Sequence, residues 1–185
     1  MTPRADAQVH EVQYYEHSSF LVGRVADFIG SGLEAGEAAV VIATPKHADL
    51  IDAELLRRGI GLAAARTAGA LVELDAVETL GAFMVAGRPD PDRFGSVIGN
   101  TIERARSNAR TPVVRVFGEM VGVLCGQGRI VAAIDIEELW NQLLGAHPCA
   151  LLHGYPIAPL HGRDMGSLSA LHTNAAGAEG SVRIG

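Results

Sequence analysis

Several polar side chains of this sequence follow apolar, strand-like runs. Thr44, Lys46 and His47 come directly after the run AAVVIA, and Glu119 comes two residues after VVRVF. In open parallel sheets, ligands bind beyond the carboxyl ends of the strands, so these positions are candidates for a binding site. The helix start after Thr44 could receive an anion, and Glu119 could act as an acid or a base. The competing interpretation is structural, with a capped helix start at Thr44 and a helix-start acid at Glu119.

The turn IATPKH lacks the residues of a phosphate loop. Such a loop has the pattern G-x-x-x-x-G-K-[ST], in which glycines let the backbone curl around phosphates while the lysine and a hydroxyl reach the γ-phosphate and the metal. Lys46 instead follows a proline and has no glycines beside it. The turn therefore does not predict nucleotide hydrolysis. A nucleotide-binding protein or enzyme that uses Lys46, His47 and Glu119 in place of the standard motif is the alternative.

Glu73 and Arg115 stand inside otherwise apolar runs, LVELD and VVRVF. A lone charge inside a sheet covered on both faces is costly unless it has a partner. If the two strands are neighbours, the residues form a structural ion pair. The functional alternative is that Arg115 holds a carboxylate or phosphate of a ligand and that Glu73 orients it.

The histidines and cysteines do not form a recognisable metal or catalytic motif. The histidines are at positions 10, 17, 47, 147, 153, 161 and 172. They lack the H-x-x-x-H or C-x-x-C spacing that lets one element present two ligands to one metal. The two cysteines, Cys125 and Cys149, are far apart and are expected to be reduced core residues. The sequence thus predicts no metal, names no cofactor and indicates no catalytic residue.

Some rings with polar tips lie at the ends of segments, where they could line a small-molecule pocket. These are Tyr14, Tyr15, His17 and Tyr155, and His153 near a strand end is a further pocket candidate. We expect residues 44–47, Glu119 and Tyr155 to converge at one edge of the sheet.

Strand-like and helix-like segments alternate along the chain. Four strands are expected within AAVVIAT, GALVELDA, TPVVRVFGEM and CALLHGYP. Helices are expected from Ser18 or Ser19 to Gly30 or Gly32, from Pro45 to Gly59, from an Asp75–Glu78 capping box, from Asp90, around 120–124, in IEELWNQLLG and in HGRDMGSLSALH. Strands separated by helices need crossover connections, which give a mainly parallel sheet. The prediction is a three-layer α/β domain over residues 10–174, with flexible segments at 1–9 and 175–185.

Length and charge limit the classes of protein that fit. The 185 residues suffice for one domain with a sizeable core. A net charge of −6 without a cluster of lysines or arginines argues against direct binding to nucleic acid or to an anionic membrane. No segment has the length and apolar character of a signal peptide or a membrane span, so a cytoplasmic protein is expected.

Taken together, several phrases resemble the MEDS family, the sensory domain of methanogens, methylotrophs and the dichloromethane-responsive regulator. They are H-x-x-x-Y-Y (His10 to Tyr15), GLEAGEAAVVIATPKH, LDAVETLGAFMVAGRPDPDRF, VRVFGEMVGVL, IEELWNQL and LLHGYP. The resemblance implies a RecA/KaiC-like core without a working phosphate loop, used to sense small molecules that include hydrocarbon-like ones. It transfers His10, Tyr14, His47, Glu119 and Tyr155 as candidates for ligand binding.

The resemblance also implies a signalling partner. Such domains are commonly joined to a DNA-binding or histidine-kinase module, or act beside anti-sigma regulators. Because this sequence shows no output domain, we expect the signal to pass by contact with a protein such as a histidine kinase or an anti-sigma factor. A ligand-free adaptor and a homo-oligomer are also compatible with the sequence.

Overall fold

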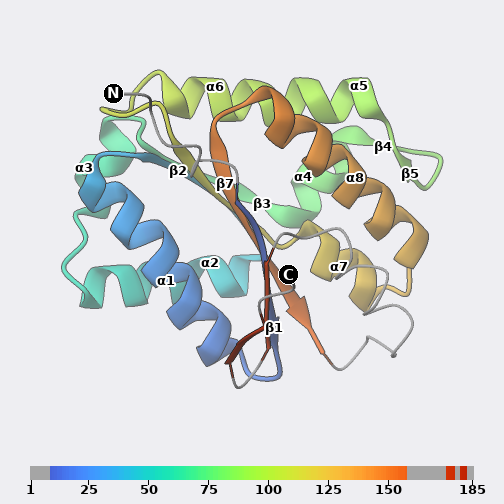
Figure 1. Cartoon of the computed structure of the whole chain (residues 1–185), viewed down its shortest axis with the longest axis horizontal. Coiled ribbons are helices and arrows are strands. Elements are labelled where there is room, and N and C mark those ends of the chain that lie inside the picture. Colours follow the sequence, from blue (N-terminus) through green and yellow to red (C-terminus); the bar gives the residue numbers. More distant parts are fainter. Residues whose placement is uncertain (1–8, 158–173, 178–179, 183–185) are drawn as a thin grey trace.

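A seven-stranded sheet with the strand order β3-β2-β6-β7-β1-β8-β9 lies at the centre of the protein (Figure 1). The computed structural model describes residues 9–157, 174–177 and 180–182. The strands of this sheet are β1 (His10–Tyr15), β2 (Ala38–Ala43), β3 (Leu71–Asp75), β6 (Val114–Gly118), β7 (Cys149–Pro156), β8 (Asn174–Gly177) and β9 (Gly180–Val182). Every neighbouring pair from β3 to β8 is parallel, whereas β8 and β9 are antiparallel.

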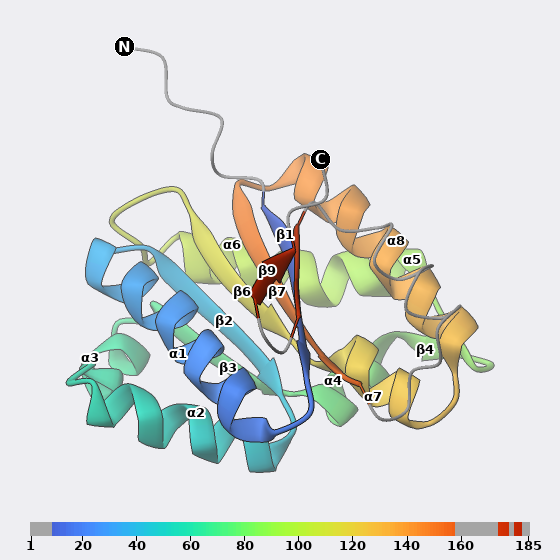
Figure 2. The same cartoon turned by 60° about the horizontal axis from the view of Figure 1, so that its bottom comes forward.

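Helices cover both faces of the sheet, as Figures 1 and 2 show. On one face lie α1 (Ser18–Ala35), α2 (Pro45–Arg57) and α3 (Leu62–Thr67). On the other face lie α4 (Ala76–Phe83), α5 (Pro91–Phe94), the π-helical turn η1 (Gly95–Gly99), α6 (Asn100–Arg106), α7 (Met120–Gly126) and α8 (Ile130–Ala146), with a small hairpin of β4 (Met84–Val85) and β5 (Arg88–Pro89). The predicted three-layer α/β architecture, with a mainly parallel sheet, is confirmed.

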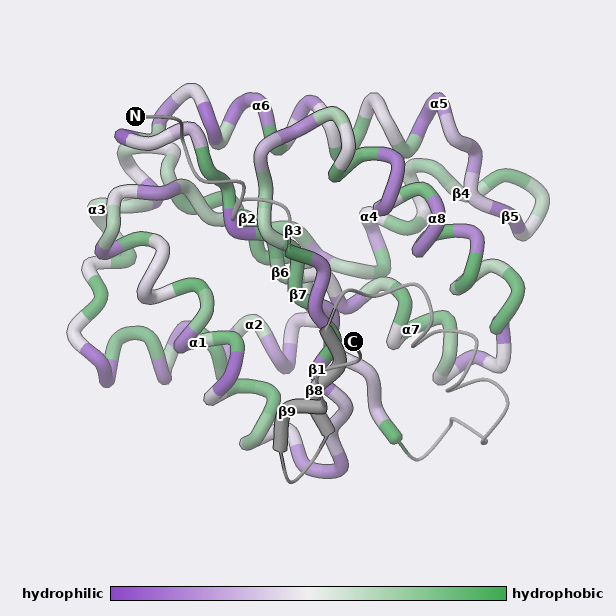
Figure 3. The backbone as a smooth tube through the Cα atoms, viewed as in Figure 1, coloured by the Kyte–Doolittle hydropathy of each residue, from purple (hydrophilic) through white to green (hydrophobic). Residues whose placement is uncertain are grey.

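Each face of the sheet has its own hydrophobic core. Successive side chains of β2 alternate between them, so that Val40 and Ile42 join the core under α4–α8 while Ala39 and Val41 join the core under α1–α3. Since all six residues of β2 are buried, the strand consists of an unbroken apolar run. The hydropathy colours of Figure 3 alternate along the outer helices, because each helix buries only one side.

The helix starts at Asp75 and Asp90 follow the sequence signals, whereas α8 begins at Ile130, six residues before the predicted segment, and one predicted helix end is wrong. The Asp75 side chain accepts hydrogen bonds from the amides of Val77 and Glu78, at 2.8 Å each, so the predicted cap is confirmed. Gly30 and Gly32 do not end α1, which continues to Ala35. They are instead packing positions, since a Cβ on Gly32 would lie 2.6 Å from Cδ of Arg115. The helix ends at Gly36, whose φ of 84° favours glycine.

The strand order overturns the Glu73–Arg115 ion pair, because β2 lies between β3 and β6. Glu73 accepts a hydrogen bond from Nε of Arg66 at 2.6 Å, and this guanidinium lowers the pKa of the Glu73 carboxyl. Arg115 instead donates to Glu37 at 2.5 Å and to the carbonyl of Phe28 at 3.1 Å. Both charges therefore have partners that sequence spacing did not indicate.

Two further differences concern the ends of the domain. Strand β1 was not predicted, although it lies between β7 and β8. The segment 175–185 was expected to be loose, whereas the structure places β8 and β9 at 174–177 and 180–182, as an antiparallel hairpin that extends the sheet beyond β1. The helix expected in HGRDMGSLSALH and residues 1–8 lie outside the described residues. Within the described ranges, no helix has both the length and the apolar character that are needed to span a membrane.

Candidate functional site

The carboxyl ends of β2 and β6 bring together Thr44, His47 and Glu119. Residue Ile42 of β2 pairs with Gly118 of β6, so the segments that follow the two strands leave the sheet side by side. Oε2 of Glu119 accepts hydrogen bonds from the amide and the hydroxyl of Thr44, at 2.8 and 3.0 Å. Oε1 of Glu119 forms a short contact with Nδ1 of His47. The carboxylate thereby joins the end of β6 to the start of α2.

Ser18 and Tyr15 complete this arrangement from β1 and α1. Oγ of Ser18 lies 2.9 Å from Nε2 of His47, and the ring of Tyr15 packs edge-on against the imidazole at 5.9 Å between centroids. His47 and Glu119 are 7% and 4% exposed, whereas Ser18 is half-buried. Burial, together with the charge and hydrogen bonding of Glu119, raises the pKa of the Tyr15 phenol. We call Tyr15, Ser18, Thr44, His47 and Glu119 the edge cluster.

The hydrogen-bond partners fix the proton positions on His47. A carboxylate only accepts, so Nδ1 of His47 carries a hydrogen that it donates to Glu119. In the neutral ring, Nε2 is then the acceptor for the Ser18 hydroxyl. The edge cluster is therefore a relay from a half-buried hydroxyl, through an imidazole, to a buried carboxylate. This order of groups can hold a polar ligand atom at Ser18 or activate the hydroxyl as a nucleophile.

Glu119 contacts the start of α2. The amide of Thr44 at this helix start already donates to the carboxylate of Glu119. A negative side chain is favourable there because the amino end of a helix carries positive partial charge. Glu119 thus contacts the turn where an external anion was considered, while the Thr44 side chain makes no capping hydrogen bond to α2 and donates to Glu119 instead. Lys46 on this turn is exposed.

The turn from β1 to α1 also lacks a phosphate loop. Strand β1 ends at Tyr15 and α1 begins at Ser18, so only Glu16 and His17 connect them. A phosphate loop needs several glycine-containing residues between strand and helix to surround the phosphates with amides. A two-residue turn with a glutamate is too short and has the wrong charge for that task.

A second polar cluster lies on the opposite face of the sheet, between β1, β7 and α8. Glu137, which is fully buried, accepts from Nδ1 of His153 at 2.7 Å and from the hydroxyl of Tyr155 in a short contact. Nε2 of His10 lies 3.1 Å from Oε2 of Glu137 and 3.4 Å from Nδ1 of His153. Nδ1 of His10 lies 2.9 Å from Oδ1 of Asn141. We call this the inner cluster.

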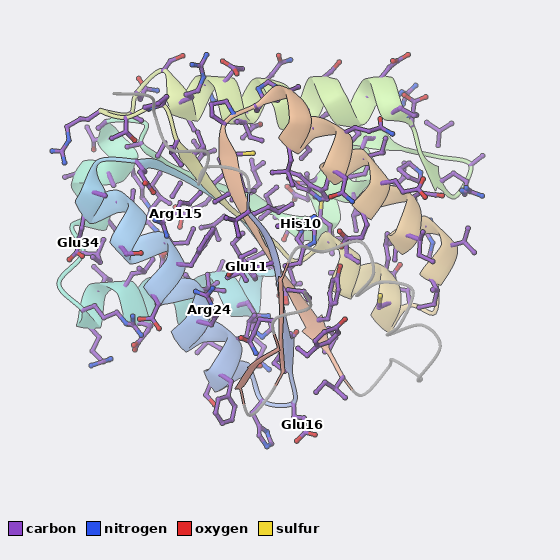
Figure 4. All side chains as sticks on the ribbon, viewed as in Figure 1. His10, Glu11, Glu16, Arg24, Glu34 and Arg115 are labelled. Carbon is purple, nitrogen blue, oxygen red and sulfur yellow. The ribbon has the colours of Figure 1, made fainter. Side chains whose placement is uncertain are left out.

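The predicted site residues therefore separate into two groups and three isolated positions. Thr44, His47 and Glu119 meet in the edge cluster, and His10, His153 and Tyr155 meet in the inner cluster, with Tyr14 packed 5.6 Å from the Tyr155 ring. Lys46 and His17 are exposed, and Arg115 lies toward α1 while His10 lies toward α8 (Figure 4). The expectation that Tyr155 converges with Glu119 is wrong, because Tyr155 belongs to the core under α8.

Sequence reasoning missed Ser18 and Glu137 as site residues. Ser18 was considered only as a possible helix start, whereas its hydroxyl contacts His47. Glu137 follows Ala133 by four residues and precedes Trp140 by three, and this spacing places it on the buried side of α8. A lone acid on an apolar helix face was the signal that could have found it. The metal-spacing rules did not apply, because the inner cluster draws on three separate elements.

Comparison with solved structures supports the fold assignment. A KaiC-like protein from Pyrococcus horikoshii OT3 superposes with a TM-score of 0.61 at 16% identity, covering 92% of this chain and 72% of that chain. The flagellar accessory protein FlaH from Methanocaldococcus jannaschii superposes with a TM-score of 0.55 at 11% identity, covering 91% and 71% of the two chains. Because the identities are low, this similarity concerns the fold, and it agrees with the RecA/KaiC-like core expected from the sequence.

The family comparison is more specific. A comparison with curated proteins finds no match. The family profile described as the methanogen/methylotroph, DcmR sensory domain matches residues 9–173, which include all residues of the edge and inner clusters. The chain therefore belongs to the MEDS family of sensory domains.

Proposed function

We propose that this protein is a sensory domain that binds a small molecule at the edge cluster and passes the signal on by contact with another protein. The observation that carries the proposal is the relay from Ser18 through His47 to Glu119, because its only partly exposed member is a hydroxyl at the protein surface. The missing phosphate loop supports a ligand other than a hydrolysed nucleotide.

The chemistry around Ser18 favours a small, partly apolar ligand with an oxygen atom. The Ser18 hydroxyl can donate to a carbonyl or alcohol oxygen if it turns away from His47. Beside it at the start of α1, the rings of His17 and Phe20 lie 6.5 Å apart, and Phe20 is 56% exposed. An exposed aromatic side chain next to a polar group suits the apolar part of such a ligand. Short-chain alcohols and similar oxygenated hydrocarbons fit this description.

The edge cluster connects the ligand position to three elements. A ligand that accepts a hydrogen bond from the Ser18 hydroxyl replaces the hydrogen bond between the start of α1 and His47 of α2. His47 in turn contacts Glu119, which follows β6. A groove of about 480 Å³ between α1 and α2 begins at Ser19 and includes Val22, Leu50 and Ala53. A change in the relative position of α1 and α2 would alter this groove. We propose that the signalling partner contacts this surface.

Thermal unfolding with a series of oxygenated short-chain hydrocarbons tests the binding proposal. We expect short-chain alcohols or ketones to raise the Tm of the wild-type chain in a saturable manner, because a ligand that binds only the folded state stabilises it. Ser18→Ala should lose this shift, whereas Ser19→Ala, at the exposed neighbouring position, should keep it. ATP with magnesium should not shift the Tm of either variant.

Two outcomes would contradict the proposal. One is a saturable Tm shift and turnover with ATP and magnesium, which would favour the nucleotide-binding alternative. The other is an equal response of Ser18→Ala and wild type to every organic probe, which would leave the edge cluster without a role in binding. If no probe shifts the Tm, a ligand-free adaptor becomes the better description.

A second candidate function is ester hydrolysis, because Ser18, His47 and Glu119 have the order of a nucleophile, a base and an orienting acid. In that reaction Ser18 Oγ attacks the acyl carbonyl while Nε2 of His47 takes its proton and returns it to the leaving alcohol. Water then releases the acid and restores the serine. If this function holds, wild type should hydrolyse 4-nitrophenyl acetate at least about 100-fold faster than Ser18→Ala. Equal rates for the two proteins would remove it.

A further inference from the structure

We propose that the inner cluster is a binding site for one divalent transition-metal ion, held by His10, Glu137 and His153. These residues come from β1, α8 and β7, and all three are buried. Their ligand atoms lie within 4.8 Å of one another. The site lies on the opposite face of the sheet from the edge cluster, so the inference is independent of the proposed function.

Two of the three distances between the ligand atoms are close to those around a metal ion, and the third is a hydrogen-bond length. With metal–ligand bonds of about 2.1 Å, neighbouring ligands lie about 3.0 Å apart in an octahedral site and about 3.4 Å apart in a tetrahedral site. Nε2 of His10 lies 3.4 Å from Nδ1 of His153 and 3.1 Å from Oε2 of Glu137. Nδ1 of His153 lies 2.7 Å from Oε1 of Glu137. One ion could therefore contact all three side chains without a large rearrangement, provided that Nδ1 of His153 releases the hydrogen that it donates to Glu137.

The contacts of His10 fit either a proton or a metal ion between the side chains. Oδ1 of Asn141 only accepts, so the hydrogen of a neutral His10 ring lies on Nδ1, 2.9 Å from Asn141. Nε2 then presents a lone pair to Oε2 of Glu137, which is also an acceptor, at 3.1 Å. Two acceptors at this distance repel each other unless a proton or a metal ion lies between them. The choice between these two cations is what the experiment must decide.

Further residues hold the proposed ligands in place. Metal-binding histidines usually donate their other ring N–H to an oxygen, and Asn141 serves His10 in this way. The Tyr155 hydroxyl contacts Oε1 of Glu137 and so orients the carboxylate. Gly118 makes room for the His153 ring, since a Cβ at this position would lie 3.0 Å from Cδ2 of His153. These neighbours are positioning residues for the metal site.

The ligand set selects the class of metal. Two imidazoles and one carboxylate suit zinc and ferrous iron, and they leave coordination positions for water or a small ligand. A bound ion would fasten β1 and β7 to α8. It would also supply a Lewis-acidic centre within a sensory domain.

Titration of the metal-free chain with Co²⁺ tests the site, because Co²⁺ replaces zinc and absorbs visible light when protein ligands hold it. We expect one equivalent to bind to wild type with this absorption, and one equivalent of Zn²⁺ to displace it. Glu137→Gln should weaken binding at least 100-fold, and Asn141→Leu should weaken it by about 10 to 100-fold. Glu103→Gln is the matched control, since it alters a surface histidine–glutamate pair at 2.8 Å and should leave binding unchanged.

If wild type binds neither Co²⁺ nor Zn²⁺, the proposal is overturned. A proton, and not a metal ion, then lies between His10 and Glu137. Equal binding by Glu137→Gln and wild type would overturn it as well. If Glu137→Gln does not fold, His10→Gln replaces it, and X-ray absorption of zinc-loaded wild type gives a second measurement. Two imidazoles in that spectrum support the site, and sulfur ligands from a cysteine contradict it.

Discussion

Among the residues that the structure describes, Glu119 and Glu137 are the buried carboxylates, and each contacts an imidazole. Burying a carboxylate is costly unless hydrogen bonds and charges replace its water. Glu119 receives the Thr44 amide and hydroxyl, and Glu137 receives His153 and Tyr155. Removing the charge from either carboxylate leaves donors that were arranged around it. Single substitutions at these residues should therefore have large effects.

Glu119→Gln should destabilise the fold by about 1–3 kcal/mol, because one side of the new amide donates where the carboxylate accepted. Urea unfolding followed by circular dichroism measures the change. Glu138→Gln, at the exposed neighbour of Glu137 on α8, is the control and should stay within about 0.5 kcal/mol of wild type. Equal unfolding midpoints for Glu119→Gln and wild type would mean that the edge cluster does not stabilise the protein.

The raised pKa of the Tyr15 phenol predicts that the folded protein loses stability in alkaline solution. Its pKa in the folded protein is raised by burial and by Glu119, so the folded state keeps the phenol proton when the unfolded chain loses it above roughly pH 10. The stabilisation is complete below that pH, and it falls as pH rises, by up to about 1.4 kcal/mol per pH unit. Urea unfolding of Tyr15→Phe between pH 9 and pH 12 should show a shallower decline than wild type. Parallel declines would show that Tyr15 does not titrate in this way.

At the residue scale, sequence reasoning predicted the edge cluster better than the inner cluster. Thr44, His47 and Glu119 follow strands, and parallel strands place such residues at one edge. Tyr155 also lies near a strand end, but its side chain points to the other face, where it contacts Glu137. The face on which a residue lies depends on register within the sheet, and register is not visible in a single sequence. Glu137 was missed because its role depends on β1 and β7.

At the element scale, close packing between α7 and β7 predicts a large difference between two glycines of one helix. A Cβ on Gly122 would lie 2.7 Å from the carbonyl oxygen of Gly154, whereas nothing lies within 4 Å of a Cβ on Gly126. Gly122→Ala should cost about 1–3 kcal/mol, which lowers the Tm by several degrees. Gly126→Ala should leave the Tm unchanged or raise it, since alanine favours helix. A lower Tm for Gly126→Ala than for Gly122→Ala would contradict this packing.

The elements differ in how clearly the sequence shows them. The apolar runs of β2 and β7 predicted strands with nearly the observed limits, because both strands are buried. Strand β1 was missed because its buried positions include the polar residues His10 and Gln13, which break the apolar run. His10 is polar because it belongs to the inner cluster. The local pattern thus fails where the strand carries a candidate site.

At the scale of the whole molecule, β1 connects the two clusters. Alternation along the strand sends Tyr15 to the edge cluster and His10 to the inner cluster, on opposite faces of the sheet. The strand order that creates this connection was not predictable, because loops of many lengths can join parallel strands in several orders. For the same reason, the predicted Glu73–Arg115 pair failed although both strands were identified.

The sheet order predicts how protection against hydrogen exchange is distributed over the molecule. Strands β2 and β6 each have a neighbour on both sides and cores on both faces, so their amides should exchange only when the whole domain unfolds. The β4–β5 hairpin has two residues in each strand and lies outside the main sheet, so it should exchange by local opening. Mass spectrometry of exchanging peptides measures both regions. In Gly122→Ala, exchange in β2 and β6 should accelerate with the loss of global stability, whereas exchange in the hairpin should not change. Early exchange of β2 in wild type would contradict a central position for this strand.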